Sequence, residues 1–421
     1  MSEVKTIATR DSYGAALVEL GKEHEDLVVL DADLAAATKT GVFKKAFPER
    51  HFDCGIAEQN MIGVAAGMAA AGLVPFASSF AMFAAGRAFE QVRNSVGYPH
   101  LNVKIGATHG GISVGEDGAS HQCCEDFALM RSIPGMVVLC PADDVEARAA
   151  VKAAYEHEGP VYLRFGRLAV PVFHDEATYK FEIGKGEVLR EGSDLAILAT
   201  GLETAEALKA AETLAAEGVN ARVINLCSIK PLDTELVLKA AKECGKVVTC
   251  EEHSVIGGLG EAVCAAIAEA GVACKVKRVG VMDEFGHSGP AKELLAQFGL
   301  DAAGIAKTLS FMGPAGPLLV VAAGDARIDN AKFKAQFGLK AKMLTPEQAV
   351  ELVGHAVGGV CPFAVNEGVE VWLDESLKRF ETVFPACGSS NSAIELTIPE
   401  LEKYAAPKGW VDVCKGWNDP A

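Results

Sequence analysis

The chain has 421 residues, half of them hydrophobic, which is enough for about two or three domains with sizeable cores. Its 39 Lys and Arg are outnumbered by 56 Asp and Glu, and the net charge of -17 disfavours non-specific binding to nucleic acid or to an anionic membrane. Twelve Cys without a CxxC pair indicate reduced thiols of a cytoplasmic protein, not a disulfide framework or a zinc site. The charged N-terminus carries no apolar run, so no signal peptide is expected.

Helices and strands alternate through the first 170 residues. The pattern predicts helices at 12–21, from 58 onward, at 81–96 and at 144–157, and strands at 27–33, 73–77, 102–107, 136–140 and 161–165. Such alternation is typical of a doubly wound parallel sheet.

No charged residue occurs between Asn60 and Gly86, a run long enough to span a bilayer. Three glycines and many alanines make it a weak candidate for insertion, and Pro75 is expected to divide it into a helix and a strand. We therefore expect a buried helix followed by a buried parallel strand, and no membrane contact.

A loosely patterned stretch at 171–186 resembles a linker, and alternation resumes after it. Strands are expected at 195–200, 221–226, 246–250 and 275–279, and helices at 203–217, 234–243 and 260–270. Beyond Gly313 the chain has short β-prone runs, for example at 369–373 and 382–384, and few long helices. We expect two α/β domains, 1–170 and 187–304, and an α+β domain at 305–421.

Glu58, in FDCGIAEQNM, stands just before the uncharged run and is expected where the chain enters a core. Burial disfavours the charged form of a carboxylate, so Glu58 needs a cation or a ligand with which it shares a proton, or it accepts from the free amides of a helix N-terminus. Asp31 and Asp33 follow a predicted strand at its carboxyl end, where open sheets bind ligands. Helix capping is the alternative for both.

The loop at 108–122, THGGISVGEDGASHQ, has four Gly and almost no apolar side chain. Ordering such a loop costs much entropy, which favours wrapping around a ligand over a plain connection. His109 and His121 could donate hydrogen bonds to phosphate or sugar oxygens, and Asp117 could accept from hydroxyls.

Three motifs in this order resemble the pyrimidine-binding half of transketolase: GIAEQNM at 55–61, SSFAMF at 78–83 and VGEDGASHQ at 114–122. The likeness continues to about residue 303. The fold that it implies is two doubly wound parallel-sheet domains, the thiamine diphosphate pyrimidine-binding fold and the transketolase C-terminal fold.

The resemblance implies that Glu58 binds the aminopyrimidine ring of thiamine diphosphate and promotes its reactive tautomer. It implies that Phe83 stacks on that ring, with Phe80 beside it, although core packing is the alternative for both. Further roles follow from the matched positions. Cofactor contact is implied for Asp33, phosphate binding for Arg10, His109 and Arg164, and sugar contact for Asp117 and His121, with His109 and His121 also counted as catalytic.

A full transketolase binds the diphosphate and its divalent metal through a GDG motif, and this sequence has none. We therefore expect Mg²⁺ to be held by a separate N-terminal transketolase subunit and not by this chain. The expected assembly is a dimer or heterotetramer that acts on sugar phosphates.

The third domain resembles the YbaK/ProX family, which hydrolyses misacylated tRNA. IAKTLSF at 305–311, VVAAGDARID at 320–329 and VGGVCPF at 357–363 carry this likeness, and Lys307 matches the lysine used near the aminoacyl ester. The first elements of that family are replaced here by transketolase-like sequence, with the join at 298–309. The truncated domain is not basic, so tRNA is not the favoured partner.

The expected function is transfer of a two-carbon ketol unit from a ketose phosphate to an aldose phosphate, a reaction of the pentose phosphate pathway. Deoxyxylulose phosphate synthesis is the alternative within the same fold. Deacylation of aminoacyl-tRNA by the third domain is the alternative from another class.

Overall fold

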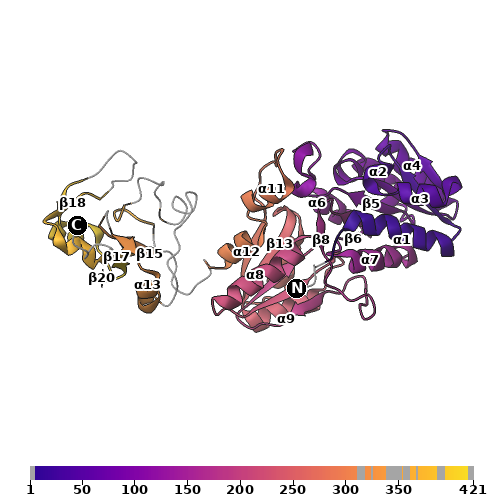
Figure 1. Ribbon diagram of the computed structural model, residues 1–421. Coiled ribbons are helices and arrows are strands. Elements are labelled where there is room, and N and C mark those ends of the chain that lie inside the picture. The colour runs from indigo at the N-terminus through magenta and orange to yellow at the C-terminus, as the bar shows by residue number, and fades with distance from the viewer. Residues whose placement is uncertain are drawn as a thin grey trace. The chain divides into compact units, whose positions relative to one another are not determined.

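The computed structural model describes residues 5–310, 318–323, 326–337, 353, 361–366, 368–385 and 394–415. The chain forms two compact units, 1–309 and 310–421 (Figure 1). Each unit has its own sheets and its own cores.

The first unit contains a seven-stranded sheet in the order β12-β6-β7-β5-β4-β2-β3. Its strands are β2 (Leu27–Asp31), β3 (His51–Asp53), β4 (Val74–Phe80), β5 (Lys104–Thr108), β6 (Val137–Leu139), β7 (Val161–Phe165) and β12 (Ser228–Lys230). All pairs are parallel except β12 with β6. The carboxyl ends of β2, β4, β5 and β7 therefore meet at one edge.

Helices cover both faces of this sheet, as expected for a doubly wound fold (Figure 1). One face is covered by α1 (Thr9–Glu23), α3 (Gly41–Ala46) and α7 (Asp144–Glu156). The other is covered by α4 (Glu58–Ala70), η2 (Met82–Arg87), η3 (Val92–Gly97) and α6 (Asp126–Arg131). Because both faces are covered, central strands such as β2 and β4 are buried at every residue, which is why polar alternation is missing from their sequences.

The uncharged run forms α4, then β4, then η2, and its predicted division at Pro75 is wrong. The chain turns at Gly72, whose φ of 92° suits glycine, and Pro75 lies inside β4 opposite Val28. The helix predicted at 81–96 consists of two wide π turns, η2 and η3, joined by the short α5 (Phe89–Gln91). Among the described residues, no helix is long and apolar enough to cross a membrane.

A second sheet in the first unit has the order β14-β13-β10-β11-β9. Its strands are β9 (Glu187–Arg190), β10 (Leu195–Ala199), β11 (Ala221–Asn225), β13 (Lys246–Ser254) and β14 (Lys275–Val281). Its helices are α8 (Glu203–Ala216), α9 (Thr234–Cys244) and α10 (Leu259–Glu269), followed by α11 (Ala291–Gln297) and α12 (Ala302–Ser310). The strands predicted here are present, and the antiparallel edge strands β9 and β12 were not predicted.

The second unit is of α+β type. A parallel three-stranded sheet joins β15 (Leu318–Val321), β17 (Glu370–Asp374) and β20 (Gly409–Val411), with α13 (Asn330–Phe337) and α15 (Ile398–Ala405) beside it. Helix α12 crosses the boundary predicted at 304/305, and the three-domain division stays a prediction. The backbone of Lys307 lies in α12, and its side chain is outside the described part of the structure.

Candidate active site

Glu58 lies in the first turn of α4 and is only 2% exposed. Its two carboxylate oxygens accept hydrogen bonds from Nη1 of Arg87, at 3.1 and 2.9 Å. The guanidinium of Arg87 also lies over the ring of Phe83, 4.5 Å from its centroid, and the Arg87 side chain is 48% exposed. Sequence reasoning missed Arg87, although it is the first charged residue after the uncharged run.

From Phe83 a series of rings leads across the edge of the sheet. The centroids of Phe83 and His121 are 5.3 Å apart, and Phe80 stacks on His109 at 3.8 Å. Phe80 also lies 5.9 Å from Phe83 and 6.3 Å from His121. Four residues predicted for the site are therefore neighbours, although they come from β4, η2 and the loop after β5.

His109 joins this series to a group of cations. Nη1 of Arg10 donates to Nε2 of His109 at 2.9 Å, and Nδ1 of His109 lies 2.8 Å from Oγ1 of Thr108. Burial, together with the charges of Arg10 and Arg167, lowers the pKa of His109 to about 3. His109 is thus neutral at pH 7. Because its Nε2 accepts from Arg10, its ring proton lies on Nδ1.

Arg164, predicted to bind phosphate, does not reach this group. It lies inside β7, where its Nε is 3.0 Å from Asp126 and its Nη2 donates to the carbonyl oxygen of Glu252 at 2.8 Å. Its side chain is 5% exposed, and both charges are buried together. Asp126 thus holds this guanidinium in the interior, and phosphate binding by Arg164 stays a prediction.

Arg167, which the sequence reasoning passed over, lies just beyond the carboxyl end of β7. Its side chain is 38% exposed, and it pairs with Glu116 at 2.8 Å. Its charge contributes to lowering the pKa values of both Arg10 and His109. The signal was the GR pair that follows β7, since residues beyond the carboxyl end of a parallel strand face the ligand side of a sheet.

The remaining predicted residues lie at the same edge. Asp33 and Asp117 are exposed, and His121 is half-buried with Nδ1 3.0 Å from Oγ of Ser120. Asp33 and His109 both have left-handed backbone, with φ of 61° and 59°, a strain that collects at functional sites. Asp31, by contrast, is buried and accepts from Leu34 N at 2.5 Å as well as from two threonines, so its role is structural.

The loop that carries His109, Asp117 and His121 is anchored by the second sheet region. The amide of Ser113 donates to Oε1 of Glu252 at 2.6 Å, and Nε2 of Gln122 donates to the carbonyl oxygen of His287 at 3.0 Å. Glu252 is 3% exposed, and burial raises its pKa against the lowering effect of Arg164. These anchors link distant parts of the chain and have no local sequence signal.

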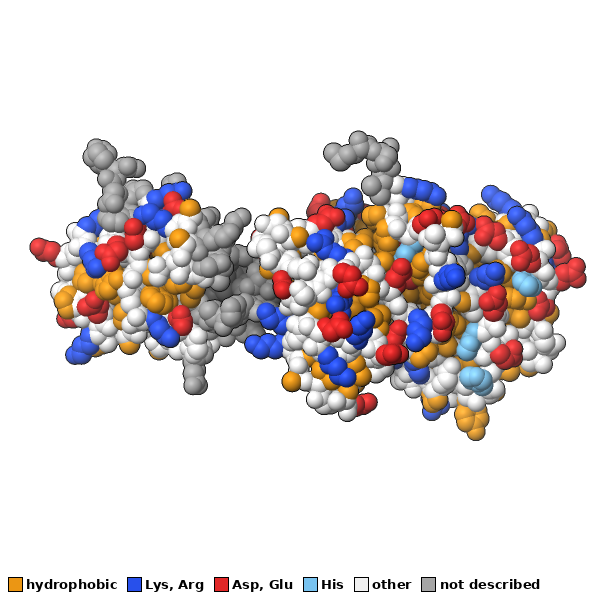
Figure 2. Space-filling model, turned by 90° about the horizontal axis from the view of Figure 1, so that it is seen from below, with side chains coloured by type: hydrophobic (Ala, Val, Ile, Leu, Met, Phe, Trp, Pro, Cys, Tyr) orange, Lys and Arg blue, Asp and Glu red, His pale blue; other side chains and the backbone are white. Residues whose placement is uncertain are grey.

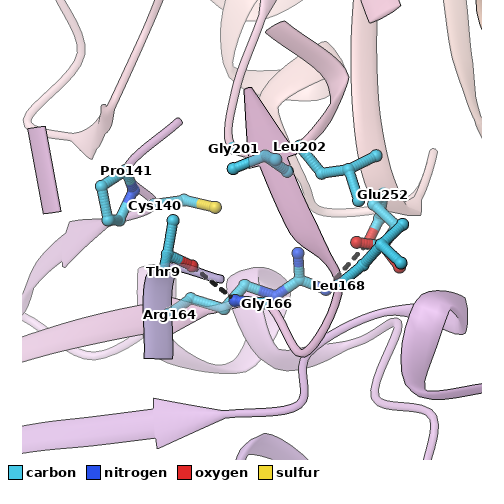
Figure 3. A pocket seen from close by; sticks show the side chains of 10 residues that line it. Thr9, Cys140, Pro141, Arg164, Gly166, Leu168, Gly201, Leu202 and Glu252 are labelled. Atoms are coloured by element: carbon cyan, nitrogen blue, oxygen red, sulfur yellow. Dashed lines mark hydrogen bonds between the residues drawn. The ribbon is translucent and has the colours of Figure 1, made fainter. Parts of the chain in front are cut away.

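A small pocket lies between Thr9 and Arg164 on one side and Gly201, Leu202 and Glu252 on the other (Figure 3). The amide of Gly166 donates to Oγ1 of Thr9 at 2.9 Å within it. Arg164 is the one predicted site residue in its lining. The pocket therefore belongs to the region that anchors the loop, and not to the ring series around Phe83.

Within the described ranges, no group of three or more His, Cys, Asp or Glu could hold a metal ion. The cysteines in the same ranges are free thiols, and most of them are buried. On the face shown in Figure 2, acidic and basic side chains are interspersed over the described residues of both units and form no continuous basic patch.

Family models match three segments of the chain. The transketolase pyrimidine-binding domain matches residues 5–172, the transketolase C-terminal domain 184–305, and the aminoacyl-tRNA editing domain 289–404. The last two overlap at 289–305, which includes part of the predicted join.

Two relatives resemble about seven tenths of the chain over nearly their whole length. The putative transketolase C-terminal section of Methanocaldococcus jannaschii is 53% identical over 71% of this chain and 94% of that protein. The 6-deoxy-6-sulfo-D-fructose transketolase subunit SqwH of a Clostridium species is 46% identical over 70% of this chain and 90% of that protein.

Among solved structures, a split-gene transketolase described as an inactive β4 tetramer is 55% identical. It has a TM-score of 0.68 and covers 72% of this chain and 97% of its own. The chain belongs to the transketolase family and is a subunit of a thiamine diphosphate-dependent transketolase of the split kind, followed by an aminoacyl-tRNA editing domain.

Proposed function

We propose that this chain supplies the aminopyrimidine-binding half and the substrate-phosphate end of the active site. With an N-terminal partner subunit it transfers a two-carbon ketol unit from a ketose phosphate to an aldose phosphate. The observation that carries the proposal is the continuous contact series that starts at Glu58 and runs through Arg87, Phe83, His121 and Phe80 to His109.

The buried end of this series fits thiamine diphosphate. Glu58 is a buried carboxylate whose described hydrogen-bond donor is the half-exposed Arg87, and Phe83 offers an aromatic face to the same guanidinium. A flat, weakly basic ring that stacks on Phe83 and shares a proton with Glu58 would satisfy both groups. When bound, the cofactor supplies the carbon nucleophile that accepts the ketol unit.

The opposite end fits a sugar phosphate. Arg10 and Arg167 bring positive charge to neutral His109 in a chain whose net charge is -17. Guanidinium groups bind phosphate oxygens through paired hydrogen bonds, and a neutral imidazole adds a hydrogen bond without repelling them. The proposal assigns contact with sugar hydroxyls to His121 and Asp117, and contact with the cofactor to Asp33.

The proposal assigns Mg²⁺ and the diphosphate group to the partner subunit, because the sequence has no GDG motif. In this proposal the active assembly is a dimer or heterotetramer. The related split-gene chain forms an inactive tetramer by its description, which supports a requirement for the missing subunit.

Reconstitution tests the proposal. The purified chain alone should show no ketol transfer between ketose and aldose phosphates, and activity should appear on mixing with the N-terminal subunit, thiamine diphosphate and Mg²⁺. Glu58→Ala should lower kcat by at least about 100-fold, the range of a lost proton-transfer group. Glu49→Ala, which removes an exposed carboxylate of the same unit, is the matched control. Strong activity of the isolated chain would overturn the requirement for a partner.

Two alternatives are tested in the same assay. Consumption of pyruvate with release of CO₂ would indicate deoxyxylulose phosphate synthesis. Hydrolysis of misacylated tRNA that survives Glu58→Ala would indicate the editing domain, whose family match spans 289–404. On the face that Figure 2 shows, the described side chains form no basic patch of the kind that tRNA binding uses.

A further inference from the structure

Arg87 makes two contacts at once. Its Nη1 donates to both oxygens of Glu58, at 3.1 and 2.9 Å, and its guanidinium carbon lies 4.5 Å from the centroid of Phe83. A guanidinium is flat, donates hydrogen bonds in its own plane and stacks on aromatic faces. These are the two contacts that the proposed function assigns to the aminopyrimidine ring.

We propose that Arg87 occupies the aminopyrimidine position in the cofactor-free chain, as a placeholder that thiamine diphosphate must displace. The proposal rests on the proposed function of Glu58 and Phe83. One buried carboxylate and one ring face cannot receive both flat groups in the same place, so the two occupants exclude each other.

The local backbone aims Arg87 at Glu58. Arg87 ends the π turn η2, in which the amide of Ala88 donates to the carbonyl oxygen of Phe83 at 3.1 Å, five residues back. The wider turn changes the direction of the residues that follow it, and such turns occur often at functional sites. Without the extra residue of this turn, Arg87 would point about 100° away around the helix axis.

The Arg87 side chain can also move away from Glu58 without disturbing the core. Its side chain is 48% exposed, and within the described residues its guanidinium donates to Glu58 alone. Glu90 lies three residues further along and is exposed, so it offers a second carboxylate at helical spacing. Release would transfer the guanidinium from a buried anion to water and a surface anion, without opening the core.

The placeholder has a thermodynamic consequence. In the free chain it neutralises a carboxylate that would otherwise be buried without a partner, which stabilises the empty site. Cofactor binding must break this ion pair, so the measured affinity is lower than that of a site with no competitor. Removing Arg87 should therefore tighten binding of the cofactor, whereas removing a residue that holds the cofactor would weaken it.

The test is calorimetric titration of the complex, assembled from the full chain, its N-terminal subunit and Mg²⁺. Arg87→Met keeps an apolar stem on Phe83 and removes the guanidinium. The Arg87→Met complex should bind thiamine diphosphate roughly 5- to 30-fold more tightly, because the cofactor no longer has to break a charged hydrogen bond with one exposed partner. Binding of inorganic diphosphate, which does not reach Glu58, should not change. Arg93→Met, which removes a nearby exposed arginine, should change neither affinity.

A second measurement does not depend on the affinity. The thermal midpoint of the cofactor-free Arg87→Met complex should lie below that of the wild type, and saturating thiamine diphosphate should remove the difference. Unchanged or weaker cofactor binding in the variant would overturn the placeholder. Failure of the wild-type complex to bind thiamine diphosphate at all would instead overturn the proposed function.

Discussion

Replacing His174 by Gln should destabilise the first unit at pH 6 and have much less effect at pH 9. His174 lies in the segment between the two sheets, and its side chain is 4% exposed. Its Nδ1 is 3.0 Å from Asp143, and its Nε2 is 3.0 Å from Glu187. One imidazolium thus joins the start of α7 to strand β9.

The direction of the pH dependence follows from these partners. Burial lowers the pKa of His174, but the hydrogen bond that its ring donates to Asp143 and the charges of Asp143, Glu146 and Glu187 outweigh this effect, and the net shift is upward. A raised pKa means that the stabilisation is complete below the unfolded value of 6.5 and is lost as the pH rises through the folded value. The lowered pKa of Asp143 keeps that carboxylate charged throughout this window.

A buried hydrogen bond between charged groups contributes about 2 kcal/mol. The unfolding entropy is about 2.1 cal/mol/K per residue, and the unit has 309 residues. Loss of this hydrogen bond should therefore lower the thermal midpoint of unfolding by about 3 °C. Scanning calorimetry of wild type and His174→Gln from pH 5.5 to 9 measures it. His24→Gln, which removes a half-buried histidine with no acidic partner among the described contacts, is the control.

The decisive quantity is the difference in thermal midpoint between wild type and His174→Gln at each pH. A difference that stays constant from pH 6 to pH 9 would refute the reasoning, because it would mean that His174 acts through packing alone. A difference that grows with pH would also refute it, since the sign would then require a lowered pKa.

Two further outcomes are expected. Arg167→Ala should raise the KM for the sugar phosphate by about 10- to 100-fold with a smaller change in kcat, since one phosphate contact contributes about 1.5–3 kcal/mol. Initial rates of the reconstituted enzyme measure both constants, and an effect on kcat alone would contradict this prediction. Asp126→Asn should lower the free energy of unfolding by about 3 kcal/mol, because it leaves the buried Arg164 without its counter-ion. Denaturant unfolding tests the second outcome, and a stable Asp126→Asn variant would show that Arg164 is solvated.

Much of the fold could be predicted because local periodicity decides it. Strand β7 has the predicted bounds, and most other elements differ by one to four residues at their ends. Where periodicity is ambiguous the prediction failed. The helix expected at 81–96 contains π turns, which insert a residue without changing the apolar character of the segment. Strand β12 pairs with β6 across almost 90 residues, and local sequence carries no trace of that pairing.

The site, too, could be predicted only in part from local sequence. Glu58, Phe83, His109 and His121 could be identified because they stand in contiguous motifs. Two arginines, 164 and 167, lie three residues apart, and the motif did not distinguish them. Their environments differ because one lies within the strand, opposite buried Asp126, and the other lies beyond its end.

Strand β12 has a consequence for how the protein can be divided. Ser228 and Lys230 pair with β6, so the first sheet borrows its last strand from the region that otherwise builds the second sheet. Lys230 also donates to the carbonyl oxygens of Arg131 and Ile133, at 2.8 and 2.5 Å. A shortened chain that stops at the linker would leave β6 as a bare edge, open to pairing with other chains. The pyrimidine-binding region is thus a sequence family without being an independent folding unit.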